Sequence, residues 1–101
     1  MADNQLRIVL HAPTADGLRR ARSNVTNLLR DDASLVVNIV VNAEGVPMAL
    51  DNPDPLTDQF LLICRNTLEK LGRESPSLTT VASGVRAVVE MQQDGWTYVR
   101  A

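Results

Sequence analysis

The sequence predicts an α/β protein in which a five-stranded, mostly parallel sheet is covered by helices on both faces. Strand-like and helix-like segments alternate along all 101 residues, and this alternation is typical of parallel strands joined by right-handed helical crossovers. The strand-like segments are nearly continuous aliphatic runs, as expected for strands that are buried on both faces. The length fits one domain, and the sequence contains neither internal repeats nor a linker.

The elements of the first half follow from the spacing of apolar residues. Residues 6–10 predict an aliphatic strand that ends at His11, and residues 12–17 form a loop and the entry to a helix. In that helix apolar residues recur at helical spacing, and Asp31-Asp32 ends it. Residues 35–41 are β-branched and nearly continuous, which predicts a second strand.

Prolines mark the middle of the chain. Pro47 fits the first turn of a short helix over residues 48–50. Pro53 and Pro55 then break that helix, because two prolines so close together cannot lie inside it. Residues 60–63 are the most apolar run of the chain and predict a third strand, buried on both faces.

The last third of the chain repeats the pattern. Asn66 is predicted as the N-cap of a helix over residues 67–71, with Glu69 three positions later and Gly72 at the end. Residues 78–82 predict a fourth strand, and Ser83 caps the helix that follows. Residues 96–99 predict a fifth strand, which we expect to pair with the first.

Composition excludes several classes of function. The net charge of −2 argues against a surface for nucleic acid or for anionic membranes. The leading residues are polar, and no apolar stretch approaches a signal peptide or a spanning helix. One cysteine forms no internal disulfide, and one histidine with one cysteine is too few for a zinc site. We therefore expect a cytoplasmic protein that holds neither a metal nor a cofactor.

Cys64 is the most informative single residue. It follows a buried strand and precedes a helix, at the carboxyl end of the strand, where α/β folds place their chemistry. Helix-start N–H groups and the neighbouring Arg65 both favour the thiolate. The other interpretation is a small buried hydrophobe, because free cysteine is among the most buried residue types. Without a Cys-x-x-Cys pair, a thiol relay takes its second sulfur from another molecule.

Other polar residues are expected at the same edge of the sheet. His11 ends the first strand, but a strand between it and Cys64 makes direct activation of the thiol unfavourable, so His11 is a residue that lines a pocket or hydrogen-bonds to a loop. Four further residues at strand ends or helix starts either line a polar pocket for an anion or cap and turn the chain. These four are Asn42, Glu44, Asn66 and Ser83.

Three arginines and two aromatic residues are predicted to have structural roles. Arg19, Arg20 and Arg22 are assigned to the outward side of the first helix, as a solvated surface or a contact between subunits. Trp96 and Tyr98 share one face of the last strand, where packing in the core or between subunits is expected in a chain so poor in aromatic residues.

Several short motifs together resemble the DsrE/DsrF-like proteins of intracellular sulfur oxidation. These motifs are Cys64-Arg65-Asn66-Thr67-Leu68, Leu71-Gly72, Ser83-Gly84-Val85 and Gly95-Trp96-Thr97-Tyr98-Val99-Arg100. The opening strand and first helix are similar too, so the resemblance covers nearly the whole chain. Residues 53–59 depart from it, because relatives often have a longer helix before the strand of the cysteine.

The resemblance implies a fold, an assembly and a function. The implied fold is a three-layer α/β/α sandwich on a five-stranded parallel sheet, and the implied assembly is a homotrimer or hexamer. The implied function is to bind or relay sulfane sulfur as a persulfide on Cys64, with sulfur-relay proteins as partners and transferase-like carriage as the only activity. The alternative is an oligomeric module that binds a small ligand or regulates a partner, in which Cys64 only packs.

Overall fold

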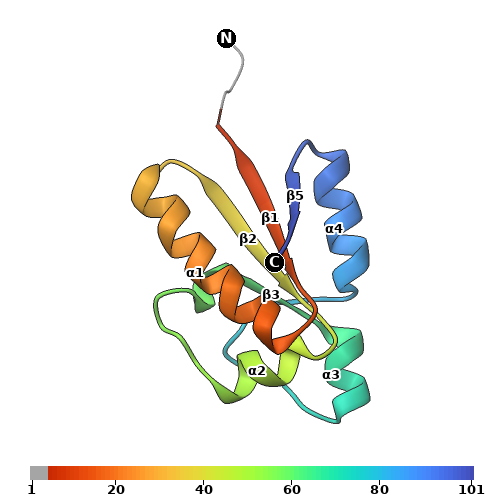
Figure 1. The fold of residues 1–101 in the computed structure, drawn as a ribbon. Coiled ribbons are helices and arrows are strands. Elements are labelled where there is room, and N and C mark those ends of the chain that lie inside the picture. The colour runs from red at the N-terminus through yellow and green to blue at the C-terminus, as the bar shows by residue number, and fades with distance from the viewer. Residues whose placement is uncertain (1–4) are drawn as a thin grey trace.

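The computed structural model describes residues 5–101 and confirms the α/β fold (Figure 1). Residues 1–4 of the polar leading segment lie outside the described residues. The strands are β1 (Arg7–Ala12), β2 (Val36–Val41), β3 (Leu61–Cys64), β4 (Thr80–Val81) and β5 (Thr97–Arg100). The helices are α1 (Ala15–Asp31), α2 (Gly45–Asp51), α3 (Arg65–Leu71) and α4 (Gly84–Gln93), with a 3-10 turn η1 (Asp58–Phe60).

The five strands form one sheet in the order β4-β3-β2-β1-β5. Every neighbouring pair is parallel, and β5 pairs with β1 as predicted. β2 and β1 therefore lie inside the sheet, whereas β4 and β5 are its edges. The carboxyl ends of β1, β2 and β3 meet at one edge of the sheet, with β2 between the other two (Figure 1).

The alternation of side chains along the strands divides the core in two. Leu10, Ile39 and Ile63 face α1 and α2 and form the larger cluster, in which these three side chains are completely or almost completely buried. Val9 and Val40 point to the opposite face and pack against Val88 of α4. Trp96 joins this smaller cluster, which confirms its expected role in packing. The sheet therefore has helices on both faces, which agrees with a three-layer α/β/α sandwich.

Several predicted boundaries are wrong. Helix α2 begins at Gly45, three residues earlier than predicted. The fourth strand contains two residues instead of five, because β3 is itself short and offers only Ile63 and Cys64 for pairing. Helix α3 begins at Arg65, so Cys64 is the N-cap residue and Asn66 lies inside the first turn. Strand β3 gives way to helix α3 without an intervening loop, and this places the thiol directly at the junction.

Arg22 also departs from its prediction. Its guanidinium forms an ion pair with Asp58 at 3.4 Å, and the two side chains are 11% and 22% exposed. Residue 22 adjoins the buried stripe of α1, and the turn around η1 folds over it, so Arg22 lies at the border of the core and not on a solvated surface. Arg19 behaves as predicted, in an exposed pair with Asp16.

The junction between β2 and α2 depends on the absence of a side chain at Gly45. A Cβ atom there would lie 2.3 Å from the carbonyl oxygen of Ala12 and 3.0 Å from Cγ1 of Val41. The helix backbone is thereby packed directly against the end of β1. The turn before it is closed by hydrogen bonds from the Gly45 N–H to the Asn42 carbonyl and from the Val46 N–H to the Ala43 carbonyl.

Replacement of Gly45 by alanine should destabilise the fold strongly. The added methyl group meets backbone, which cannot rotate away, so we expect Gly45→Ala to lower the free energy of unfolding by about 3 kcal/mol, the upper end of overpacking costs. Urea denaturation at one fixed protein concentration measures this. The exposed substitution Gln93→Ala is the control and should change stability by less than about 0.5 kcal/mol. Equal unfolding midpoints for the two variants would contradict the packing argument.

Candidate functional site

The carboxyl edge of the sheet brings together His11, Asn42 and Tyr98. Nε2 of His11 lies 3.0 Å from Oδ1 of Asn42, and Nδ1 of His11 lies 2.9 Å from the Tyr98 hydroxyl. Because the amide oxygen of Asn42 only accepts hydrogen bonds, Nε2 carries the hydrogen. In the neutral ring Nδ1 is then the acceptor for the Tyr98 hydroxyl. His11 thus bonds to the loop after β2, which is the structural role considered for it.

Cys64 lies at the same edge, in the neighbouring strand to Asn42. The residue is 5% exposed. A Cβ atom at Gly84, the first residue of α4, would lie 3.4 Å from Cβ of Cys64 and 3.3 Å from Cβ of Asn42. The backbone of α4 therefore begins directly over the thiol and between it and the His11–Asn42 pair. This close approach is possible because residue 84 is glycine.

The surroundings of the sulfur favour its charged form. Burial raises the pKa of Cys64, but polar groups around the sulfur outweigh it and hold the pKa below the ordinary value of a thiol. These groups are, in order, the N–H of Gly84, the N–H and the hydroxyl of Thr67, and the N–H of Asn66. They come from two helices, whereas the sulfur makes no N-cap hydrogen bond of regular geometry. The expected thiolate environment is present, although its donors differ from those predicted.

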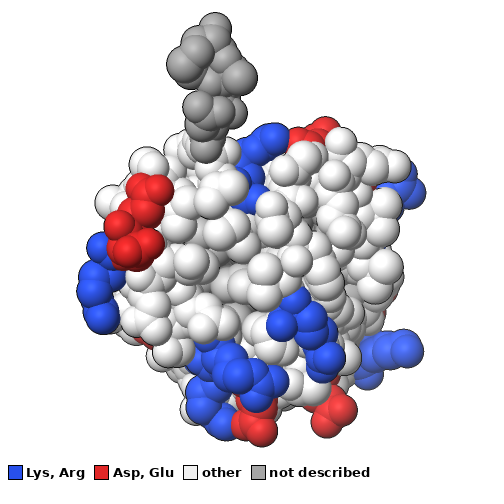
Figure 2. Space-filling model, turned by 45° about the horizontal axis from the view of Figure 1, so that its top comes forward, with Lys and Arg blue, Asp and Glu red and all other residues white. Residues whose placement is uncertain are grey.

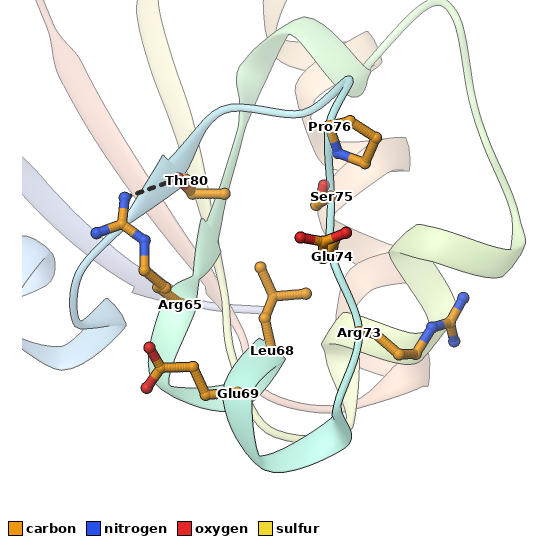
Figure 3. A pocket seen from close by; sticks show the side chains of 8 residues that line it. All are labelled: Arg65, Leu68, Glu69, Arg73, Glu74, Ser75, Pro76 and Thr80. Atoms are coloured by element: carbon orange, nitrogen blue, oxygen red, sulfur yellow. Dashed lines mark hydrogen bonds between the residues drawn. The ribbon is translucent and has the colours of Figure 1, made fainter.

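Arg65 points elsewhere. Its guanidinium donates a hydrogen bond to Oγ1 of Thr80 at 3.1 Å (Figure 3). There it lines a cavity of about 390 Å³ between α3 and the segment that leads to β4. The cavity is lined by Arg65, Leu68, Glu69, Arg73, Glu74, Ser75, Pro76 and Thr80. Thr80 pairs with Ile63, whose side chain faces α1 and α2. Cys64 is the next residue of β3, so its side chain points to the opposite face of the sheet.

The remaining predicted residues are distributed along the edge. Ser83 caps α4, and its hydroxyl accepts a hydrogen bond from the Arg86 N–H at 3.3 Å. Glu44 is exposed at the start of α2 and makes no cap hydrogen bond. The Asn66 side chain is exposed, and its backbone contributes to the sulfur environment. Among the residues predicted for the site, Asn42 is the one for which a direct contact with His11 is found.

The sequence reasoning missed Thr67, Gly84 and Tyr98 as members of this site. With Cys64 as the N-cap, Thr67 is the third residue of α3, a position whose side chain can contact the helix start. The prediction of Asn66 as the N-cap placed Thr67 first in the helix instead, and so gave it no such role. Gly84 follows a capping serine, where a glycine signals close approach of the backbone to a neighbour. Tyr98 pairs with Val9, which lies two residues before His11 and on the same face of β1, so the predicted β5–β1 pairing already brings Tyr98 near His11.

The face of the molecule in Figure 2 carries no extended basic patch that would suit a polyanion. On the face in Figure 2, basic and acidic side chains are interspersed and lie mostly around the rim, so that no patch of one sign covers it. Among residues 5–101, no group of three His, Cys, Asp or Glu side chains is placed to hold a metal ion. The described helices also include none that is long and apolar enough to cross a membrane.

The lowered pKa of Cys64 links its ionisation to stability. The pKa in the folded protein is below that of the unfolded chain, near 8.5, so the thiolate stabilises the fold above that value. This contribution is lost as the pH falls through the lowered folded-state pKa. We expect the difference in unfolding free energy between the wild type and Cys64→Ser to grow from about pH 6 to about pH 9. A difference that stays constant or shrinks with rising pH would mean that the pKa is not lowered.

The chain is similar to a solved structure. No family model and no curated protein matches the chain. Among solved structures, a protein of unknown function from Methanobacterium thermoautotrophicum, MTH1491, is 29% identical, with a TM-score of 0.78. The match covers 96% of this chain and 100% of that one. The chain is thus similar over nearly its whole length to a protein whose own function is unknown.

Proposed function

We propose that this protein binds or relays sulfane sulfur as a persulfide on Cys64, in the manner that its resemblance to the DsrE/DsrF-like proteins implies. One observation supports the proposal above all. N–H groups of two helices and the hydroxyl of Thr67 surround the sulfur and lower its pKa in spite of burial. A lowered pKa increases the thiolate fraction at neutral pH, and the thiolate is the nucleophile. The same groups would hold the anionic persulfide that results.

The proposed reaction conserves charge and needs no external oxidant. The Cys64 thiolate attacks a sulfane sulfur of inorganic polysulfide and forms a new S–S bond. The S–S bond of the donor breaks, and its electron pair leaves with a polysulfide that is one sulfur shorter. Transfer onward is the same exchange in reverse, with an acceptor thiolate as the attacking group.

The burial of Cys64 restricts the donor. With 5% of the residue exposed, the proposal favours a small inorganic donor over a protein persulfide as the first source of sulfur. Glu44 and Asn66, which are exposed at this edge, would meet a larger acceptor of the sulfur. Such a protein would be a carrier with transferase-like activity and would work in the reducing cytoplasm.

A second candidate function rests on the same burial. If Cys64 only packs, the protein is a module that binds a small ligand or regulates a partner, and its polar contacts are those of His11, Asn42 and Tyr98. The two functions differ in the reactivity of the thiol. A packed cysteine resists alkylation until the protein unfolds, whereas a carrier reacts while folded.

Incubation with polysulfide should add one sulfur atom to the folded protein. Intact-mass measurement should detect the adduct, which should disappear on treatment with a reductant because the S–S bond is reducible. Cys64→Ser should give no adduct under identical conditions. If the wild type gains no mass and Cys64 resists alkylation in the folded state, the carrier function is wrong and the second candidate remains.

We further propose that the chain forms a homo-oligomer, a trimer or a hexamer as the resemblance implies. An exposed apolar surface around the edge strand β5 supports this. All four residues of β5 are exposed, among them Tyr98 at 37% and Val99 at 40%. On α4, Val85 and Val89 are 61% and 46% exposed. Together with the open edge of the sheet, these side chains are the surface that a second copy would cover.

Substitution in this surface should dissociate the oligomer. Light scattering of the wild type should give a multiple of the 11.1 kDa chain. Val89→Glu introduces a charge into the proposed interface and should shift the mass toward that of one chain, while Gln93→Glu on the same helix should not. A wild-type particle of 11.1 kDa at micromolar concentration would contradict the proposal.

A further inference from the structure

We propose that copies of this chain associate head to tail, with Leu56 of one copy seated in an apolar cavity beside β5 of the next. The inference deepens the proposed homo-oligomer and rests on it, whereas it is independent of any reaction at Cys64. Three observations support it: a leucine fixed in an exposed position, a cavity on the opposite side of α1, and two unpaired charges of opposite sign.

Leu56 is the side chain that would be inserted. It is 76% exposed, the largest value among the large apolar side chains of residues 5–101. Its backbone N–H donates a hydrogen bond to Oδ1 of Asp54 at 3.1 Å, and the hydroxyl of the buried Thr57 donates to Oδ2 of Asp54 at 2.9 Å. The Asp54 N–H in turn donates to Asp58, which pairs with Arg22 of α1. A leucine held in this way loses little conformational entropy when it docks.

The cavity lies where α1 leaves β5 uncovered. It has a volume of about 370 Å³, and its apolar lining consists of Ile8, Leu10, Leu28 and Val99. Val99 pairs with Leu10, so both side chains point to the face of the sheet that α1 covers. Val99 also belongs to the exposed surface around β5 that the proposed oligomer would bury. The cavity therefore continues that surface onto the second face of the edge strand.

The positions of Leu56 and of the cavity require two different copies. The turn that carries Leu56 and strand β5 lie on opposite sides of α1 (Figure 1). A chain therefore does not fill its own cavity, and each copy offers one leucine and one cavity. Such a contact joins two different surfaces, and repetition of it closes into a ring when the rotation between copies permits. The proposed trimer or hexamer would contain rings of this kind.

Unpaired charges flank the two surfaces with complementary sign. Arg30 lies beside Leu56, and Asp31 lies at the border of the cavity. Neither forms an ion pair within the part of the chain that the structure describes. Asp31 is also the last residue of α1, where the negative end of the helix dipole disfavours a carboxylate. Insertion of Leu56 would bring Arg30 of one copy to Asp31 of the next, and this complementarity selects a second copy as the partner.

Substitution of Leu56 should dissociate the oligomer without unfolding the chain. Leu56→Asp places a charge in the apolar cavity and should weaken association at least about thirtyfold, the effect of losing a central apolar anchor. Leu56→Met should change it less than about tenfold. Leu71→Asp, at a leucine of α3 that is 41% exposed, is the matched control and should leave association unchanged. Light scattering over a dilution series measures association, and urea unfolding checks that each variant is folded.

Cross-linking tests the direction of the contact. Pro55 adjoins Leu56, Asn27 lines the cavity, and both residues are exposed. In a Cys64→Ser chain, Pro55→Cys combined with Asn27→Cys should be joined by a bismaleimide into covalent species of up to the full number of copies. A mixture of the two single variants should give pairs only, and each single variant alone should give none.

The outcomes separate this contact from the oligomer on which it rests. Dissociation by Leu56→Asp together with cross-links in the double variant supports the head-to-tail contact. A multimer that Leu56→Asp leaves intact, or a double variant without cross-links, overturns the contact, and loss of that multimer in Val89→Glu then leaves the homo-oligomer standing. A wild type of 11.1 kDa at micromolar concentration overturns both.

Discussion

The contact between Gly45 and the end of β1 is the constraint on which the site depends. Because the helix backbone at residue 45 lies against the Ala12 carbonyl, the chain after β2 has no freedom to form a wider loop. The turn must fit into the residues from Asn42 to Gly45. Asn42 is thereby directed to His11, and the N–H of Ala43 is directed to Thr67. A packing contact between two backbones thus sets the positions of polar groups in β1, in the turn after β2 and in α3.

The thiol at Cys64 combines two opposing influences. Withdrawal from water disfavours a charged sulfur, while donors of α3 and α4 favour it, and the donors prevail. The donors are mostly backbone groups, so their direction is set by the fold and costs no side-chain entropy. Arg65, a long and mobile cation, was expected to do this and instead binds Thr80. In a buried setting, fixed dipoles of the backbone take the place of a nearby charge.

Most of the fold was predictable because it follows from local patterns. Aliphatic runs, capping by Ser83 and chain breaks at Gly72 and the prolines gave the element order, and β5 pairs with β1 as expected. The N-cap of α3 was mispredicted because asparagine is a good capping residue and cysteine a poor one. Here the direct passage from strand to helix overrides that preference. The Thr67–Ala43 and His11–Tyr98 contacts join residues 24 and 87 positions apart, and no local pattern reports such pairs.

The two-residue strand β4 has a consequence for motion. It is held to β3 by a short ladder, continued by the bond from the Ile63 N–H to the Thr79 carbonyl at 2.9 Å. An edge with so few backbone hydrogen bonds opens locally at a small fraction of the free energy of global unfolding. Amide hydrogens there would exchange with solvent long before those of the central strands β1 and β2. Fraying of this one edge exposes the backbone of Ile63 and Cys64 to water while the rest of the sheet remains folded, so the strand that carries the thiol is less rigid than its neighbours.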